Sequence, residues 1–216
     1  MRLVLLGLLA IAVVGLAQAA EVKTPIHQQL PEGSRIGIYC NFEYIDSAFY
    51  QDPLIAWGNA LDVGPRDCLS YLDFYHYGYG FPGPYNYYIW VFDWTTCTPL
   101  FQSPMLQAAD AAGAPIEEIV YLCDFGWHAA GPIFIGIEPL SCAAPNDCYP
   151  DIMFDYTDPI DGCGALVDPY AVPPTCFTIT AGGIPLDFLL GVIVGECPPP
   201  IATESTTWGA VKGLYK

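Results

Sequence analysis

Two aromatic-rich runs separated by turn-forming residues dominate the middle of the chain. Residues 85–96 are almost all β-branched or aromatic, a composition typical of pleated, half-buried strands. A second run spans residues 69–79, and the connection 80–84 reads Gly-Phe-Pro-Gly-Pro, which is turn chemistry. The pattern predicts a long antiparallel hairpin at the centre of a β-sandwich. Because side chains alternate across a strand, we expect one face of the second run to fill the core with Trp90, Phe92 and Trp94.

The rest of the chain shows further short strand patterns between turns. Strands are expected at 35–44, 116–123, 132–140, 152–156, 176–180 and 187–196. Residues 54–61 fit a strand or a helical turn, 104–114 a short helix or a loop, and 142–151 a loop. With 21 glycines and 21 prolines, the chain is typical of an all-β protein. We predict an antiparallel, jelly-roll-like β-sandwich with at most one short helix.

The first residues have the three parts of a secretory signal. Met1 and Arg2 precede an apolar run at 3–16, and Ala17-Gln18-Ala19 fits a cleavage site. The alternative is a membrane anchor, but the run is short for a span of about 20 residues. We therefore expect a signal peptide over 1–19, an extended lead-in over 20–34 and a domain over 35–197. The protein is expected to be exported to the cell surface or medium, with the periplasm as the alternative.

The charge is strongly unbalanced. The formal net charge is −17, and no lysine or arginine lies between Asp67 and Val211, where 17 of the 23 acidic residues are found. Such a chain repels nucleic acid and anionic lipid headgroups, so neither is expected as a partner. The carboxylates must be solvated, hydrogen-bonded or bound to cations.

Nine cysteines in an exported chain predict disulfides. The odd count leaves at least one thiol free or paired between molecules, which allows self-association. Cys142 and Cys148 flank a tight loop and are the predicted pair, while the other pairings stay open. Zinc is not expected because no C-x-x-C pair occurs.

Catalytic signatures are weak. The chain has three histidines and no G-x-S-x-G elbow, so a nucleophilic triad is not indicated. Glycoside hydrolysis needs two carboxylates across a cleft, and adjacent Glu117 and Glu118 point to opposite faces of their strand. The other carboxylates on or beside predicted strands are Asp73, Asp93 and Glu138.

Two other groups of residues are candidate binding sites. Aromatic rings gather around the central turn and can stack on the apolar faces of sugars, unless they only cap the core: Tyr75, Tyr77, Tyr79, Phe81 and Tyr85. Four carboxylates precede Gly162 within eleven residues and offer oxygen ligands for a calcium cofactor: Asp151, Asp155, Asp158 and Asp161. Their spacing is not that of an EF-hand, and Asp-Pro and Asp-Gly also start ordinary turns.

The C-terminus reads as a linker and a short tail. Pro198-Pro199-Pro200 begins a linker over 198–207, and residues 208–216 read Trp-Gly-Ala-Val-Lys-Gly-Leu-Tyr-Lys. A helix would place Trp208, Val211, Leu214 and Tyr215 on one face, beside Lys212 and Lys216. Such a short helix is marginal alone, so we expect the tail to dock on its own acidic domain or on a separate partner that recognises Trp208, Lys212, Tyr215 and Lys216. The alternative is a frayed terminus without a role.

The chain resembles uncharacterised secreted bacterial β-sandwich proteins that end in W-G-x-V-K-x-L-Y-[KR]. The resemblance rests on the nine tail residues and on the general style of the domain. It implies a surface or matrix role and offers no catalytic residues to carry over. We therefore expect an exported, non-catalytic surface or extracellular binding module, with carbohydrate as the leading ligand class. The alternatives are a structural subunit of an extracellular assembly and a secreted glycoside hydrolase.

Overall fold

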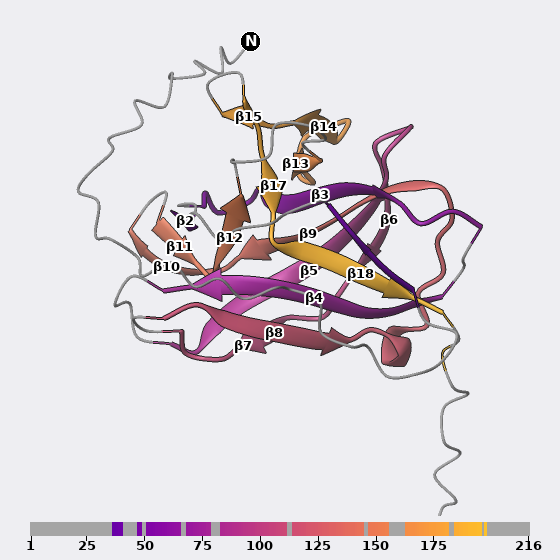
Figure 1. Cartoon of the computed structure of the whole chain (residues 1–216). Helices are drawn as coiled ribbons and strands as arrows, with labels where there is room; N and C mark the ends of the chain where they lie inside the picture. Colours follow the sequence, from indigo (N-terminus) through magenta and orange to yellow (C-terminus); the bar gives the residue numbers. More distant parts are fainter. Residues whose placement is uncertain are drawn as a thin grey trace, which may run out of the picture.

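The computed structural model confirms an all-β, antiparallel architecture (Figure 1). It describes residues 36–40, 47–48, 51–65, 68–78, 83–111, 114–144, 147–155, 163–181, 184–195 and 197. Most of the predicted domain over 35–197 is therefore covered. The predicted signal peptide, lead-in, linker and tail lie outside the described residues. Among the described residues, no helix has the length and apolar character that crossing a membrane requires.

The first sheet has seven strands, and all its pairings are antiparallel. Its main path is β1 (Ile36–Tyr39), β18 (Leu190–Val194), β4 (Leu69–Tyr77), β12 (Asp151–Asp155) and β17 (Asp187–Phe188). β2 (Ser47–Ala48) pairs with β12, and β8 (Ile116–Tyr121) pairs with β4. The β4 strand is thus the central element, because β18 and β8 both run along it.

The second sheet also has seven strands. Its path is β14 (Thr175–Thr178), β13 (Gly164–Asp168), β3 (Ala56–Asp62), β9 (Pro132–Pro139), β5 (Tyr85–Asp93) and β6 (Thr98–Gln102), with β7 (Leu106–Ala108) beside β5. The predicted short helix at 104–114 is therefore wrong for its centre, which is strand β7. The one helical segment described is the 3-10 turn η1 (Cys123–Phe125).

Two small hairpins complete the described fold. One joins β15 (Thr180–Ala181) to β16 (Ile184–Pro185), and the other joins β10 (Ser141–Ala144) to β11 (Asp147–Tyr149). The second hairpin replaces most of the loop predicted over 142–151. Its register sets Cys142 directly opposite Cys148, and the two form a disulfide as the sequence predicted.

The predicted central hairpin is wrong in its pairing. Strands β4 and β5 have the expected positions in sequence, but they belong to different sheets. Instead of sharing hydrogen bonds, their side chains pack across the sandwich. The Phe74 and Tyr87 rings meet edge to face at 5.6 Å. The intervening segment carries the chain from one sheet to the other, a route that turn composition alone does not distinguish from a hairpin.

The face of β5 that packs into the main core is the opposite of the predicted one. Tyr85, Tyr87, Ile89 and Val91 are buried in the main cluster with residues of both sheets. The predicted core rings belong to a smaller cluster on the other face, where Trp90 and Phe92 are buried and Trp94 is partly buried. Both faces of β5 are thus covered, so alternation could not identify the main core.

The smaller cluster is covered by the second sheet itself. Cys176 in β14 forms a disulfide with Cys97, which directly precedes β6. Since β14 and β6 are the two edges of this sheet, the disulfide joins its opposite edges. Cys176 also packs against the cluster that contains Trp90 and Phe92. The sheet therefore curls around its aromatic face.

Asn59 on β3 links the two sheets through side-chain hydrogen bonds. Its amide nitrogen donates to the carbonyl oxygens of Phe188 at 2.7 Å and Leu190 at 2.8 Å, and its oxygen accepts from the Phe188 N–H at 3.1 Å. Asn59 is fully buried. Three hydrogen bonds thus satisfy a polar group that would otherwise destabilise the core.

Candidate functional site

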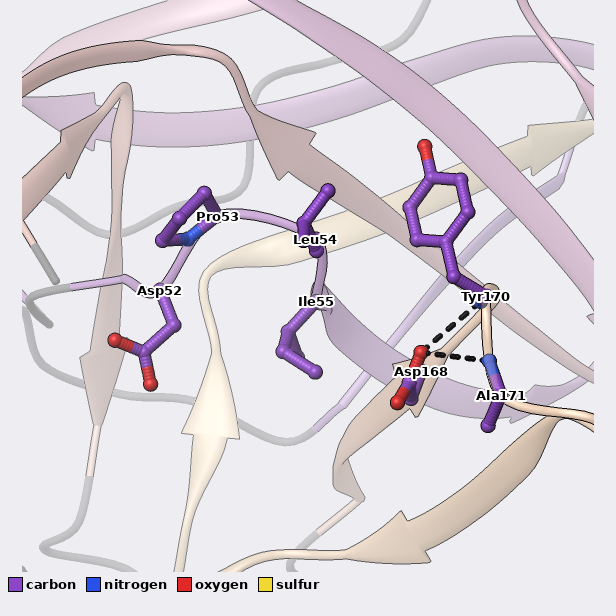
Figure 2. A pocket seen from close by; sticks show the side chains of 7 residues that line it. All are labelled: Asp52, Pro53, Leu54, Ile55, Asp168, Tyr170 and Ala171. Atoms are coloured by element: carbon purple, nitrogen blue, oxygen red, sulfur yellow. Dashed lines mark hydrogen bonds between the residues drawn. The ribbon is translucent and has the colours of Figure 1, made fainter. Parts of the chain in front are cut away.

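An open hollow of about 450 Å³ lies where the start of β3 meets the end of β13. The two strands are antiparallel, and Val167 lies opposite Ala56. This register brings the segment before β3 beside the segment after β13. The lining residues are Asp52, Pro53, Leu54, Ile55, Asp168, Tyr170 and Ala171 (Figure 2).

Local turn chemistry shapes both walls of the hollow. The Asp168 carboxylate accepts hydrogen bonds from the backbone N–H groups of Tyr170 and Ala171, both at 3.0 Å, which holds the chain in an Asx-type turn (Figure 2). On the other wall Leu54 has a φ of 69°. A left-handed conformation is rare for a bulky residue, and the Leu54 side chain is 58% exposed. Strained, exposed residues of this kind concentrate at binding sites.

Tyr170 is the ring that the hollow presents to solvent. It is 49% exposed, while its hydroxyl lies 3.1 and 3.0 Å from the two carboxylate oxygens of Glu138. The same carboxylate accepts from the Trp90 indole N–H at 2.8 Å. The Trp90 and Tyr170 rings also meet edge to face at 6.1 Å. Tyr170 is therefore held at its tip and along its ring.

The electrostatics of this group favour a neutral, hydrogen-bonded Tyr170. Burial, together with the neighbouring Glu138 carboxylate, raises the pKa of the Tyr170 hydroxyl to about 12. Burial also raises the pKa of Glu138, although the hydrogen bonds from Trp90 and Tyr170 oppose that shift. At the rim of the hollow, burial raises the pKa of Asp52. The hydroxyl thus remains a donor over the whole physiological range.

The arrangement offers contacts that a polar ligand with an apolar face could use. A pre-positioned aromatic ring gives a large contact area at a low cost in conformational entropy. Asp52 and Asp168 add carboxylate oxygens, which accept hydrogen bonds from hydroxyl groups. The Asp168 carboxylate is already engaged by two backbone N–H groups. Glu138, which contacts the Tyr170 hydroxyl, is fully buried.

The predicted aromatic cluster at the central turn is divided between two faces. Tyr75 and Tyr77 are partly buried against Met153 and Leu189 on the outer side of the first sheet. Tyr85 is fully buried in the main core, so its predicted role as an exposed platform is wrong. Tyr79 and Phe81 lie outside the described residues.

The predicted calcium ligands are separated by regular structure. Asp151 and Asp155 belong to β12 rather than to a flexible loop, and both are buried. Four residues of strand span about 13 Å, so these two carboxylates cannot reach one ion at ligand distances near 2.4 Å. Asp158 and Asp161 lie outside the described residues, and the calcium site stays a prediction that depends on them.

A second polar group lies in the interior rather than at the surface. Asp151 and His76 are both fully buried, and the His76 Nε2 atom is 3.7 Å from a Glu118 carboxylate oxygen. The Tyr85 hydroxyl lies 3.3 Å from an Asp110 carboxylate oxygen. Within the described part of the chain, neither Asp151 carboxylate oxygen has a hydrogen-bond partner. This group bears on stability rather than on ligand access.

Sequence reasoning missed Tyr170 and Leu54. The Asp168-Pro169-Tyr170 sequence is a turn signal, and a solvent-facing ring after it was the available clue. Pairing of β3 with β13 brings the two segments together across more than one hundred residues, and no local pattern encodes it.

A scan against models of known protein families finds no match for this sequence, and a search of curated proteins finds no relative. The geometry of the hollow is therefore the basis for its functional interpretation.

Proposed function

We propose that this protein is an exported, non-catalytic binding module whose ligand site is the hollow at Tyr170. The single observation that carries the proposal is a half-exposed ring held in place by Glu138 and Trp90. The fixed hydroxyl and the exposed ring together leave Tyr170 pre-positioned for contact with a ligand. The disulfides of the fold are compatible with an oxidising, exported location.

Carbohydrate is the ligand class that fits this surface best. A sugar offers an apolar face for the Tyr170 ring and hydroxyl donors for Asp52 and Asp168. The net charge of −17 disfavours phosphate-bearing ligands and nucleic acid. Leu54 adds an exposed apolar contact on the opposite wall.

A glycan array followed by calorimetric titration of the full mature chain tests this proposal. Covering roughly 100 Å² of ring contributes about 2–3 kcal/mol at ~25 cal/mol per Å². Tyr170→Ala should therefore weaken binding roughly 50-fold. Tyr170→Phe keeps the ring, loses the hydroxyl contact to Glu138, and should weaken binding by less.

The matched control is Phe177→Ala, which removes a 46% exposed ring on β14 that does not line the hollow. Its affinity should equal that of the wild type. Absence of binding to any glycan would refute the ligand class, whereas equal binding by wild type and Tyr170→Ala would refute the site. Release of new reducing ends from a bound glycan would favour the glycoside hydrolase, with Asp52 and Asp168 as its carboxylates.

One observation favours the structural-subunit alternative. Among the described strands, β8 pairs only with β4, so its other side is an open edge. Ile119 on that strand is 53% exposed. Open edges support strand addition between molecules, yet Glu117 and Glu118 place negative charge on the same strand. Sedimentation at high ionic strength, which screens these charges, would reveal such pairing as a concentration-dependent increase in mass.

A further inference from the structure

Three cysteines meet at one end of the first sheet, and none of them lines the hollow. Cys68 directly precedes β4, Cys123 follows β8 in η1, and Cys197 follows β18. Both β8 and β18 run antiparallel to β4, so their ends lie beside its start. Figure 1 shows the β8 and β18 arrowheads at the side of the sheet where β4 begins. The three sulfur atoms lie within 4.8 Å of one another.

Cys197 is within disulfide reach of both other members. The Cα–Cα distance is 6.2 Å from Cys197 to Cys68 and 5.3 Å to Cys123. Disulfides typically join Cα atoms 4.4–6.8 Å apart, so either bond forms without moving the backbone. The other six cysteines form three separate pairs: Cys40–Cys163, Cys97–Cys176 and Cys142–Cys148. The unpaired ninth cysteine is therefore a member of this trio.

We propose that Cys68, Cys123 and Cys197 form a thiol–disulfide exchange site in which Cys197 alternates between its two neighbours. When Cys197 is bonded to Cys123, the Cys68 thiolate attacks the Cys197 sulfur. A Cys68–Cys197 bond forms, the Cys123–Cys197 bond breaks, and Cys123 leaves as the thiolate. The reverse step is identical in form, and no external oxidant or reductant is consumed.

The two states differ in which thiol solvent can reach. Cys68 is only 4% exposed, whereas Cys123 is partly exposed. The Cys123 sulfur lies 3.8 Å from the Ser70 carbonyl oxygen, an acceptor for its thiol in the reduced state. Exchange thus moves one thiol between a protected and an accessible position. The accessible Cys123 thiolate is a site for mixed-disulfide formation with small disulfides, releasing one equivalent of the small thiol.

Peptide mapping of the full chain without reduction tests the proposal. Native protein is treated with N-ethylmaleimide for increasing times, quenched in acid, and digested with pepsin, because low pH suppresses thiolate exchange. Before labelling, both the Cys68–Cys197 and the Cys123–Cys197 peptides should be recovered. Label should then rise to one per chain at Cys123 while the Cys123–Cys197 peptide disappears. The Cys142–Cys148 peptide should stay unchanged and serves as an internal control.

Two variants and a probe complete the design. Cys68→Ser and Cys123→Ser should each hold a single disulfide to Cys197 and lose all labelling at this site. Cystamine, a cationic disulfide suited to an acidic protein, should modify Cys123 in the wild type and not in Cys123→Ser. A single pairing that never changes during labelling would overturn the proposal. A metal ion retained by three thiols in native mass spectrometry would overturn it as well, and the wild-type map alone decides if a variant does not fold.

Discussion

Replacing the buried Asp151 by asparagine should stabilise the protein at neutral and alkaline pH. Asp151 is fully buried on β12, and neither of its carboxylate oxygens has a hydrogen-bond partner among the described residues. Burial, with a smaller contribution from the Asp147 charge, raises its pKa from 3.8 to about 9, and the smaller effect of the nearby Gln51 backbone N–H opposes this shift. The native state therefore keeps this carboxyl protonated under conditions where the unfolded chain ionises it.

The sign and size follow from proton linkage. Between pH 5 and pH 8 the native Asp151 holds a proton that the unfolded state has released. The free energy of unfolding therefore falls as pH rises, by up to about 1.4 kcal/mol per pH unit. Over three units the loss reaches ~4 kcal/mol. Asparagine does not titrate, so Asp151→Asn should remove this slope and leave the contributions of other groups unchanged.

Urea denaturation at pH 5, 6, 7 and 8 measures the effect directly. The difference in unfolding free energy between Asp151→Asn and wild type should grow steadily with pH in favour of the variant. The control is Asp124→Asn, which removes an exposed carboxylate in η1 and should follow the wild-type curve. Parallel curves for Asp151→Asn and wild type would refute the assignment of a buried, protonated Asp151.

Two further predictions concern the stability of the fold, and a third concerns the C-terminal tail. Asn59→Ala should lower the free energy of unfolding by about 3 kcal/mol or more, because it leaves Phe188 and Leu190 backbone groups unpaired in the core. A loss below about 1 kcal/mol in urea denaturation would contradict a role of Asn59 in joining the two sheets. The Cys97→Ala, Cys176→Ala double variant opens a 79-residue separation and should lose about 2–4 kcal/mol, and an unchanged melting temperature would show that sheet closure does not depend on this bond. Deleting residues 201–216 should leave the calorimetric melting temperature nearly unchanged while altering retention at the cell surface, and failure of the truncated chain to fold would make the tail part of the core.

Local sequence patterns predicted the positions of the strands better than they predicted which strands and cysteines pair. The alternation at 132–140 and the aromatic run at 85–96 correspond to β9 and β5. The sequence does not indicate which face of β5 packs into the main core, because both faces are apolar: Ile89 and Trp90 are buried on opposite sides of the strand. The Cys142–Cys148 pair was predictable because the two cysteines are only six positions apart in the sequence. The other pairings depend on sheet topology that no short segment contains.

The candidate site was less predictable for the same reason. An Asp-Pro-Tyr turn is visible in the sequence, but the role of Tyr170 depends on Glu138 and Trp90, which β9 and β5 supply. The cluster of carboxylates in the sequence predicted calcium ligands at Asp151 and Asp155. In the structure the two residues lie at opposite ends of β12, and burial raises the pKa of Asp151 so that it is protonated at neutral pH.

The bond at Cys197 also determines how the domain bears mechanical load. Tension applied to the chain beyond residue 197 enters the fold at Cys197 and crosses a disulfide to Cys68 at the base of β4, or to Cys123 beyond β8. It therefore bypasses β18, which would otherwise peel away one hydrogen bond at a time. Strand β4 is flanked by β18 and β8, whose ladder bonds run perpendicular to the strands. With the Cys68–Cys197 bond in place, pulling on β4 shears both ladders together, whereas the Cys123–Cys197 bond directs the load to the ladder between β8 and β4.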